Sequence, residues 1–271
     1  MGARGACRTL DVKSRDQLLT LITIALTFGS GATDVSAFTR LGGVFTSVMT
    51  GNIVFFGLAA AEGSVSLATH TTVAIGGYIA GVAVATWVSH SVKTRGERSA
   101  EADPETRAEA DARAEVDARA EAEARAEADQ ARVLPGYVSW TLFTELALLA
   151  GAAIGWEVTG ARPLGWAQFV LLAVTSAAMG IQSAAVNELG FRNFSTTFLT
   201  GTLTWLVTSV VRPGGDSSGG LRRLSALIAL AAGAGLSGLL VAHAARVVPV
   251  LPLAAMVTAL VLSRFPVRAG E

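Results

Sequence analysis

Charged residues and cysteine are scarce in this chain, and each shortage excludes a class of protein. Only 15% of the 271 residues are charged, whereas a soluble domain usually has about a quarter of its residues charged. Basic and acidic residues balance at 21 each, so charge predicts no nucleic-acid partner. The single cysteine, Cys7, excludes an intrachain disulfide and any multi-cysteine metal site.

Sequence signatures of catalysis are also missing. The three histidines, His70, His90 and His243, lie far apart and lack the spacing of metal ligands. The chain contains no Gly-x-Ser-x-Gly elbow and no phosphate-binding loop. We therefore expect no enzyme, no catalytic residues, no metal and no cofactor.

Long apolar runs dominate what is present. The chain is 51% hydrophobic with a mean hydropathy of +0.51, and its runs are long enough to cross a hydrocarbon core of roughly 30 Å. The sequence predicts an all-α polytopic membrane helix bundle, with the lipid bilayer as its partner. About eight apolar segments are expected, at 18–35, 44–61, 71–92, 137–158, 167–186, 194–211, 224–245 and 247–262.

The second and sixth segments leave the topology open, because each contains a Thr-Gly pair and either crosses or is re-entrant. If all eight cross, both termini are cytoplasmic and the charged linker lies outside. If six cross, the linker lies inside. Arginines near segment ends favour eight crossings, and the basic tail before the first segment places the N-terminus in the cytoplasm.

The chain divides by composition at a charged, low-complexity linker, residues 93–135. There, acidic residues precede arginines by four positions, and Asp103-Pro104 suits a helix start. We predict a solvated helix that serves as a spacer or as a docking arm for another protein. The remaining parts are a tail (1–17), segments 1–3 (18–92), segment 4 (136–160), segments 5–8 (161–264) and a second tail (265–271).

Two stretches about 150 residues apart resemble each other and predict a duplication. The unit would have four segments, arranged as parallel repeats if all cross and as inverted repeats if the second segment is re-entrant. The matched positions are Gly31 with Gly180, Thr33-Asp34 with Gln182-Ser183, Leu41-Gly42 with Leu189-Gly190, Thr50-Gly51 with Thr200-Gly201, Gly76 with Gly233, and Gly81 with Gly238.

Asp34 is the residue that stands out in the first segment, because a carboxylate there costs on the order of 3 kcal/mol on insertion scales. One interpretation is an ion- or proton-coupling group. Structural alternatives are a hydrogen bond to backbone broken after Gly31, or a pair with Arg40. Glu145 is a second buried carboxylate candidate, which would bind a proton or pair with a cation.

Uncharged polar residues beside glycines suggest a central site. They either hydrogen-bond to neighbouring helices or, with Asp34, line a site where the helices open. The polar candidates are Thr50, Asn52, Gln182, Thr200 and Thr202, and the helix-opening candidates are Gly31, Gly51, Gly180 and Gly201.

Two further glycine pairs fit close helix packing, Gly77-x-x-x-Gly81 and Gly151-x-x-x-Gly155. The contacts would lie within one chain or between the chains of a homo-oligomer. The sequence leaves both arrangements open.

These motifs together resemble the YoaK-like family of bacterial integral membrane proteins, a family of unknown function. The resemblance implies a bacterial plasma-membrane location and supplies no substrate. The charged repeat from Asp103 to Gln130 departs from the shorter connection usual in that family. The motifs are Gly31-x-x-Asp34, Gly43-Val44-Phe45, Thr50-Gly51-Asn52, Gly180-x-Gln182 and Thr197-x-x-Thr200-Gly201-Thr202.

Two functions are consistent with the sequence. The first is a permease for a small solute or ion, with the polar site between two repeats. The second is a non-transporting scaffold or sensor whose linker helix binds a partner.

Overall fold

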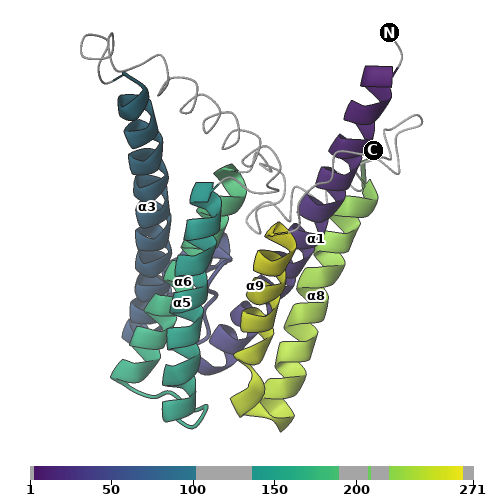
Figure 1. Cartoon of the computed structure of the whole chain (residues 1–271). Helices are drawn as coiled ribbons and strands as arrows, with labels where there is room; N and C mark the ends of the chain where they lie inside the picture. The colour runs from purple at the N-terminus through teal and green to yellow at the C-terminus, as the bar shows by residue number, and fades with distance from the viewer. Residues whose placement is uncertain (1–2, 102–135, 189–206, 209–219, 265–271) are drawn as a thin grey trace.

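Helices form every regular element in the part of the chain that the structure describes. The computed structural model describes residues 3–101, 136–188, 207–208 and 220–264 (Figure 1). The all-α expectation is confirmed. The elements are α1 (Ala3–Arg40), α2 (Met49–Glu62), α3 (Val65–Glu101), α5 (Gly136–Val158), α6 (Trp166–Glu188), α8 (Gly220–His243), the short 3₁₀ helix η3 (Ala245–Val247) and α9 (Val250–Ser263).

Six stretches of these helices are long and apolar enough to cross a membrane. They confirm a multipass membrane protein, and they match six of the eight segments expected from hydropathy. The stretches are Gln17–Arg40, Val65–Ser91, Val138–Val158, Trp166–Asn187, Leu224–His243 and Ala245–Ser263.

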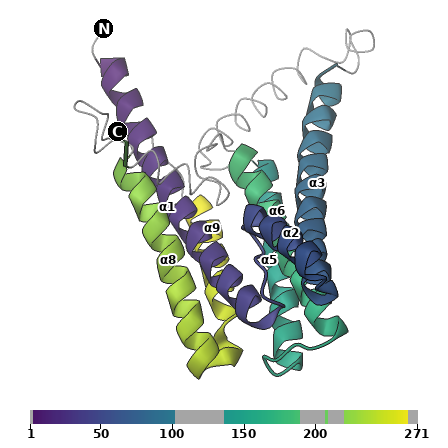
Figure 2. The same ribbon diagram turned by 180° about the vertical axis from the view of Figure 1, so that it is seen from behind.

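The second expected segment is too short to cross. The α2 helix has 14 residues, about 21 Å at 1.5 Å per residue, against a hydrocarbon core of roughly 30 Å. Figure 2 shows the connection after α1 turning back beside α1, and α2 then descending to the end where α1 finished. The structure therefore favours the re-entrant alternative for this segment. The sixth expected segment, 194–211, lies almost wholly outside the described residues.

The charged linker starts and finishes at one end of the molecule. Figure 1 shows the last turn of α3 and the first turn of α5 at the end where α1 begins. The linker's own residues, 102–135, lie outside the described part of the chain. Its two attachment points fit the six-crossing topology, with the linker on the side of the N-terminus.

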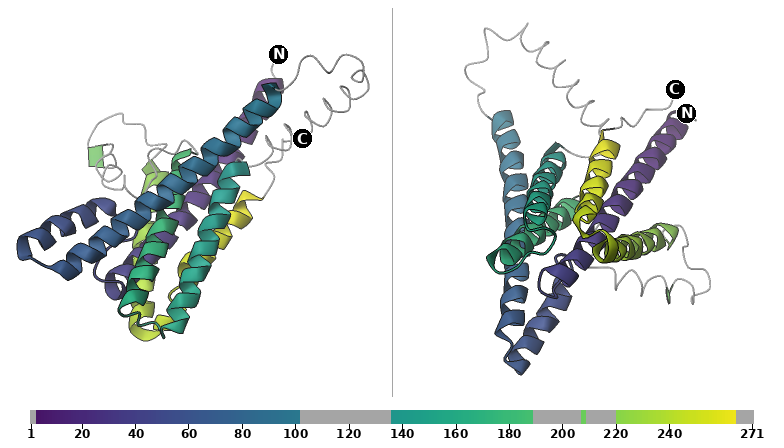
Figure 3. Two further views of the ribbon diagram at one scale, coloured as in Figure 1. Left: turned by 90° about the vertical axis from the view of Figure 1, so that its left-hand side faces the viewer. Right: turned by 90° about the horizontal axis from the view of Figure 1, so that it is seen from below.

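The long helices form two three-helix bundles. In the first bundle α1 packs along α8 and α9, and in the second α6 packs along α3 and α5, with α2 against α3 (Figure 3). The bundles meet where α5 faces α9 and α6 faces α1. We call this contact surface the seam.

Glycines bring α1 and α8 into backbone contact in the first bundle. A Cβ added to Gly31 would collide with the carbonyl of Leu230, and a Cβ added to Gly233 would collide with the carbonyl of Phe28. Each helix thus packs a glycine against a backbone carbonyl of the other helix. In both helices the glycine comes three residues after the carbonyl that the other helix contacts. Close approach of this kind strengthens helix packing in lipid.

The second bundle repeats this contact between α6 and α3. A Cβ on Gly180 would collide with the carbonyl of Tyr78, and a Cβ on Gly81 with the carbonyl of Ala177. The spacing along both helices is the same as in the first bundle. Gly31 therefore takes the place of Gly180, as the sequence comparison suggests.

Gly81 lies against α6 as Gly233 lies against α1, so the contacts match Gly81 with Gly233. They do not support the predicted pairings of Gly76 with Gly233 and of Gly81 with Gly238. Gly77 also lies against α6, at the carbonyl of Ala173. The first glycine pair thus packs within one chain. A Cβ on Gly151 would meet nothing within 4 Å, so that glycine makes no close helix contact here.

Exposed tryptophans lie near both ends of the membrane-crossing helices. Trp87 and Trp140 are 71% and 70% exposed and lie toward the N-terminal end of the molecule, and Trp166 is 78% exposed at the opposite end. Tryptophan prefers the two interfaces of a bilayer. The ring positions are consistent with the six crossings.

Candidate functional site

Asp34 holds the connection between α1 and α2. Its Oδ1 accepts hydrogen bonds from the Thr46 backbone N–H at 2.8 Å, the Thr46 hydroxyl at 2.9 Å and the Ser47 backbone N–H at 2.8 Å. Its Oδ2 accepts from the Ser47 hydroxyl at 2.5 Å. The carboxyl is buried and makes four hydrogen bonds, so it fixes the backbone just before α2.

Asn52 holds the same connection from the other side. Its Oδ1 accepts from the Phe45 N–H at 2.9 Å, and its Nδ2 donates to the Phe45 carbonyl at 2.6 Å. The side chain is fully buried and replaces the backbone partner that a strand or helix would give Phe45. We call residues 41–48 with Asp34 and Asn52 the clamped loop.

The helices run unbroken through the three described glycines that were proposed to open them. Gly31 lies inside α1, Gly180 inside α6, and Gly51 in the first turn of α2. The backbone after Gly31 is therefore helical, and Asp34 does not bond to broken backbone there. Arg40 instead donates to the Val241 carbonyl at 3.2 Å, which leaves Asp34 to Thr46 and Ser47.

Glu145 presents the opposite situation. Its side chain on α5 is 0% exposed, and neither carboxyl oxygen has a hydrogen-bond partner among the described residues. A buried polar group without a partner is costly, and an ionised one far more so. Such a group needs an explanation beyond packing.

The surroundings of Glu145 come from all four helices that meet at the seam. The pocket is lined by Leu26 and Gly29 of α1, Glu145 and Leu149 of α5, Met179 and Gln182 of α6, and Pro252, Ala255 and Met256 of α9. The pocket has no room for a water molecule. Glu145 therefore lies at a tightly packed four-helix junction.

Gln182 is the polar side chain that shares this pocket. Its Nε2 donates across the seam to the Ser30 hydroxyl at 2.9 Å and to the Leu26 carbonyl at 3.3 Å. Ser30 in turn donates to the Leu26 carbonyl at 3.1 Å. The amide thus ties α6 to α1 beside Glu145.

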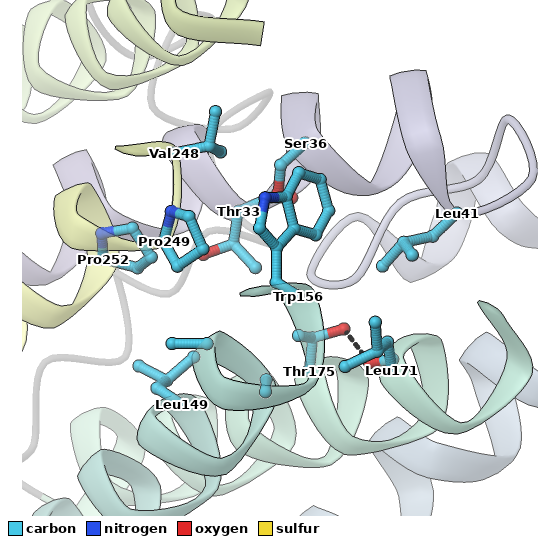
Figure 4. Close-up of a pocket in the computed structure, with 12 residues that line it drawn as sticks. Thr33, Ser36, Leu41, Leu149, Trp156, Leu171, Thr175, Val248, Pro249 and Pro252 are labelled. Atoms are coloured by element: carbon cyan, nitrogen blue, oxygen red, sulfur yellow. Dashed lines mark hydrogen bonds between the residues drawn. The ribbon is translucent and has the colours of Figure 1, made fainter. Parts of the chain in front are cut away.

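A second, larger cavity of about 30 Å³ continues the seam from Leu149 and Pro252, which line both pockets. This volume holds one or two water molecules, since roughly 10–15 Å³ suffices for one. Figure 4 shows Trp156 of α5 between Thr33 and Ser36 of α1 and Thr175 of α6. Thr33 and Ser36 lie on the upper side of the cavity in this view and Thr175 on the lower side, so hydroxyl residues line an otherwise apolar cavity from both sides.

Two hydrogen bonds close the seam at the end opposite the N-terminus. Trp156 Nε1 donates to the Ala245 carbonyl at 2.8 Å, and Gln168 Nε2 donates to the Arg40 carbonyl at 2.9 Å. Each joins one bundle to the other. We call these two bonds the latch.

Comparison with known proteins decides the family. A family described as "Protein of unknown function (DUF1275)" matches residues 22–107 and 120–263, which is most of the chain. The chain belongs to this family. The match omits residues 108–119, in the charged linker that was expected to depart from the family pattern.

One curated relative supports the assignment. The chain is 26% identical to "UPF0700 transmembrane protein YoaK" of Bacillus subtilis (strain 168) over 196 residues, covering 72% of this chain and 67% of the relative. The expected YoaK-like resemblance is thereby confirmed. No solved structure matches.

In this family member, the residues predicted to form one polar site do not come together in the described part of the chain. Asp34 and Asn52 belong to the clamped loop, whereas Gln182 lies at the four-helix junction beside Glu145, which the sequence singled out separately. Thr50 is exposed in the first turn of α2. Thr200, Gly201 and Thr202 lie outside the described residues.

Ser30, Thr46 and Ser47 were not singled out from the sequence. Hydroxyl residues are common in α1, and most of them bond to a carbonyl of their own helix, as Thr23, Thr27 and Thr33 do. Composition therefore gave no reason to select Ser30. Thr46 and Ser47 become significant only once the loop folds back onto Asp34.

Proposed function

We propose that the protein is a permease for a small solute or ion, and not an enzyme, with its path along the seam. The observation that carries this proposal is Glu145, a carboxyl without a described partner, placed where four helices from both bundles meet. Ionisable groups inside membrane proteins usually face a transport path or a partner. The adjoining cavity extends this position along the seam.

An inverted repeat is the second support. We assign α1, α2, α3 and α5 to one unit and α6, residues 189–219, α8 and α9 to the other. The matched glycine contacts of α1 with α8 and of α6 with α3 are what such a repeat requires. Transporters built in this way bind their substrate near the bilayer midplane, between the repeats.

The packing within and across the bundles suits a rocking motion. Each bundle is joined internally by backbone contacts at glycines, whereas the seam holds one cavity, the adjoining pocket of Glu145 and a few hydrogen bonds. Rigid bundles that move about a weaker surface are one way to expose a central site to each side in turn.

The test is a transport assay on purified protein in liposomes. Liposomes would be incubated with a mixture of amino acids, sugars, short carboxylates and inorganic cations, and their contents analysed by mass spectrometry. The variant Ala152→Leu fills the cavity wall, since Ala152 is buried and lines it. The matched control is Ala147→Leu, at an exposed position on the same helix.

We expect a solute that accumulates through the wild-type protein and through Ala147→Leu, with uptake at least tenfold lower through Ala152→Leu. Equal uptake in protein-free liposomes would overturn the proposal. Normal transport after deletion of residues 102–130 is also expected. Loss of a bound partner protein on that deletion, without any transport in the wild type, would favour the scaffold or sensor.

A further inference from the structure

We infer that Glu145 is a proton-binding site, which holds a proton while the seam is closed and releases it when the seam opens. The inference deepens the proposed permease by naming its coupling ion. It rests on the geometry around the carboxyl, and the binding of the proton itself can be tested without a substrate.

An ionised Glu145 would lack any compensating partner among the described residues. The carboxyl is fully buried, and both oxygens lack a described hydrogen-bond donor. Gln182 Nε2, the nearby amide donor, is directed to Ser30 and Leu26 instead. An ionised carboxylate in this position would be uncompensated, so the closed seam requires a bound positive charge.

The cation bound to Glu145 must be small. The pocket has no room for a water molecule, and hard metal cations need several oxygen ligands around them. Among the described lining residues, Gln182 provides the one side-chain oxygen apart from Glu145, and the other side chains are apolar or methionine. A proton needs neither space nor further ligands.

Glu145 has no titratable neighbour in the described lining of its pocket. The residues that α1, α6 and α9 contribute to the described lining are Leu26, Gly29, Met179, Gln182, Pro252, Ala255 and Met256. None of these is titratable or charged. Another group in this lining therefore cannot exchange a proton with Glu145, and the proton must come and go by an opening of the seam.

The route of the proton to Glu145 leads along the seam. Leu149 and Pro252 separate Glu145 from the hydroxyl-lined cavity, because both residues line both pockets. The latch closes the seam beyond that cavity through Trp156 and Gln168. Parting the bundles at the latch would bring water to the carboxyl and allow it to ionise.

The experiment is infrared spectroscopy of the full-length protein reconstituted in lipid. A protonated carboxyl has a C=O stretch that is separate from the amide bands and shifts when H₂O is replaced by D₂O. We expect such a band at neutral pH in the wild type, its loss in Glu145→Gln, and its retention in the control Glu157→Gln. Glu157 lies on the same helix and is exposed.

A second variant covers the case in which Glu145→Gln does not fold. Glu145→Asp keeps the carboxyl and should show the band at a shifted frequency. The inference is overturned if the band is unchanged in folded Glu145→Gln or absent from the wild type. It is also overturned if added Na⁺ removes the band at constant pH, since the site would then bind a metal cation.

The outcomes also separate this inference from the permease proposal. A Glu145 band in a protein that transports nothing would keep the proton site and remove the permease. Transport without the band would keep the permease and remove the proton site.

Discussion

Two carboxyl groups inside the membrane helices have opposite surroundings. Asp34 accepts four hydrogen bonds from Thr46 and Ser47, whereas Glu145 has no described partner. A carboxylate that accepts several backbone N–H bonds is stabilised where it lies. The structure therefore gives Asp34 a sufficient structural role and leaves Glu145 as the group that still needs a ligand.

Substitution of Asp34 separates its structural role from a coupling role. In Asp34→Ala, two backbone N–H groups lose their acceptor, and unfolding should become easier by about 3 kcal/mol or more. Asp34→Asn keeps one acceptor oxygen and should cost about 1–2 kcal/mol. The measurement is unfolding in detergent with increasing sodium dodecyl sulfate, followed by tryptophan fluorescence.

The control is Glu62→Ala, at an exposed position at the end of α2, and it should unfold like the wild type. If the clamped loop is the whole role of Asp34, folded Asp34→Asn transports normally. Loss of transport in Asp34→Asn with near wild-type stability would restore Asp34 as a coupling group.

The sequence identified both carboxylates but not what each one contacts. Asp34 and Glu145 are conspicuous because charge is rare in apolar segments. The partners of Asp34 depend on the path of residues 41–48, which turns back in three dimensions beside α1. That path depends on glycines such as Gly42, whose φ is +101°. A Cβ added to Gly42 would collide with the His70 ring. A hydropathy profile contains no information about either constraint.

At the scale of elements, the sequence predicted the long helices well and the short one poorly. Six of the apolar segments became membrane-length helices, because 20 or so apolar residues have few alternatives in lipid. The segment at 44–61 had enough apolar residues to cross, but α2 begins only at Met49. Residues 41–48 form a loop instead of a helix, and in this loop Thr46 and Ser47 donate hydrogen bonds to Asp34.

Alanine substitutions test the glycine contacts that hold each bundle together. Gly31→Ala and Gly180→Ala should each destabilise the protein by about 1–3 kcal/mol, as overpacked interfaces do, because backbone of the facing helix occupies the space. The matched controls are Gly76→Ala and Gly235→Ala, where a Cβ meets nothing within 4 Å. Those two should be neutral or stabilising by up to about 1 kcal/mol, from helix propensity.

Unfolding in sodium dodecyl sulfate measures all four variants on one scale. Equal effects of Gly31→Ala and Gly180→Ala would agree with the repeat assignment. A stable Gly31→Ala protein would show that α1 and α8 separate without cost and that the first bundle is not held together by this contact.

At the scale of the whole molecule, the re-entrant α2 determines the direction in which each later helix crosses. Every later crossing runs opposite to the direction that it would have if α2 crossed the membrane. Because α2 returns to the end where α1 finished, α3 crosses back and brings the charged linker to the side of the N-terminus. The second unit of the proposed repeat would then start from the opposite side, so the duplication would be inverted and not parallel. One short helix thus determines both the linker's side and the symmetry of the proposed permease.

Cysteine labelling in intact cells tests this topology. In a Cys7→Ser background, single cysteines replace Glu62, at the end of α2, and Arg162, between α5 and α6; both positions are exposed. A third variant, Ser99→Cys, lies in the last turns of α3. With the N-terminus in the cytoplasm, a membrane-impermeant maleimide should label Glu62→Cys and Arg162→Cys from outside, and Ser99→Cys only after permeabilisation.

The native Cys7, tested in the wild type, serves as the matched reporter for the N-terminal side and should behave like Ser99→Cys. Labelling of Ser99→Cys from outside, together with Arg162→Cys protected, would restore the eight-crossing topology, because an α2 that crosses moves both positions to the opposite side. The inverted repeat would then be wrong as well, since it requires an odd number of crossings in each unit. A crossing α2 would raise that number from three to four. Labelling of Ser99→Cys and Cys7 alone would keep six crossings and invert the whole protein in the membrane.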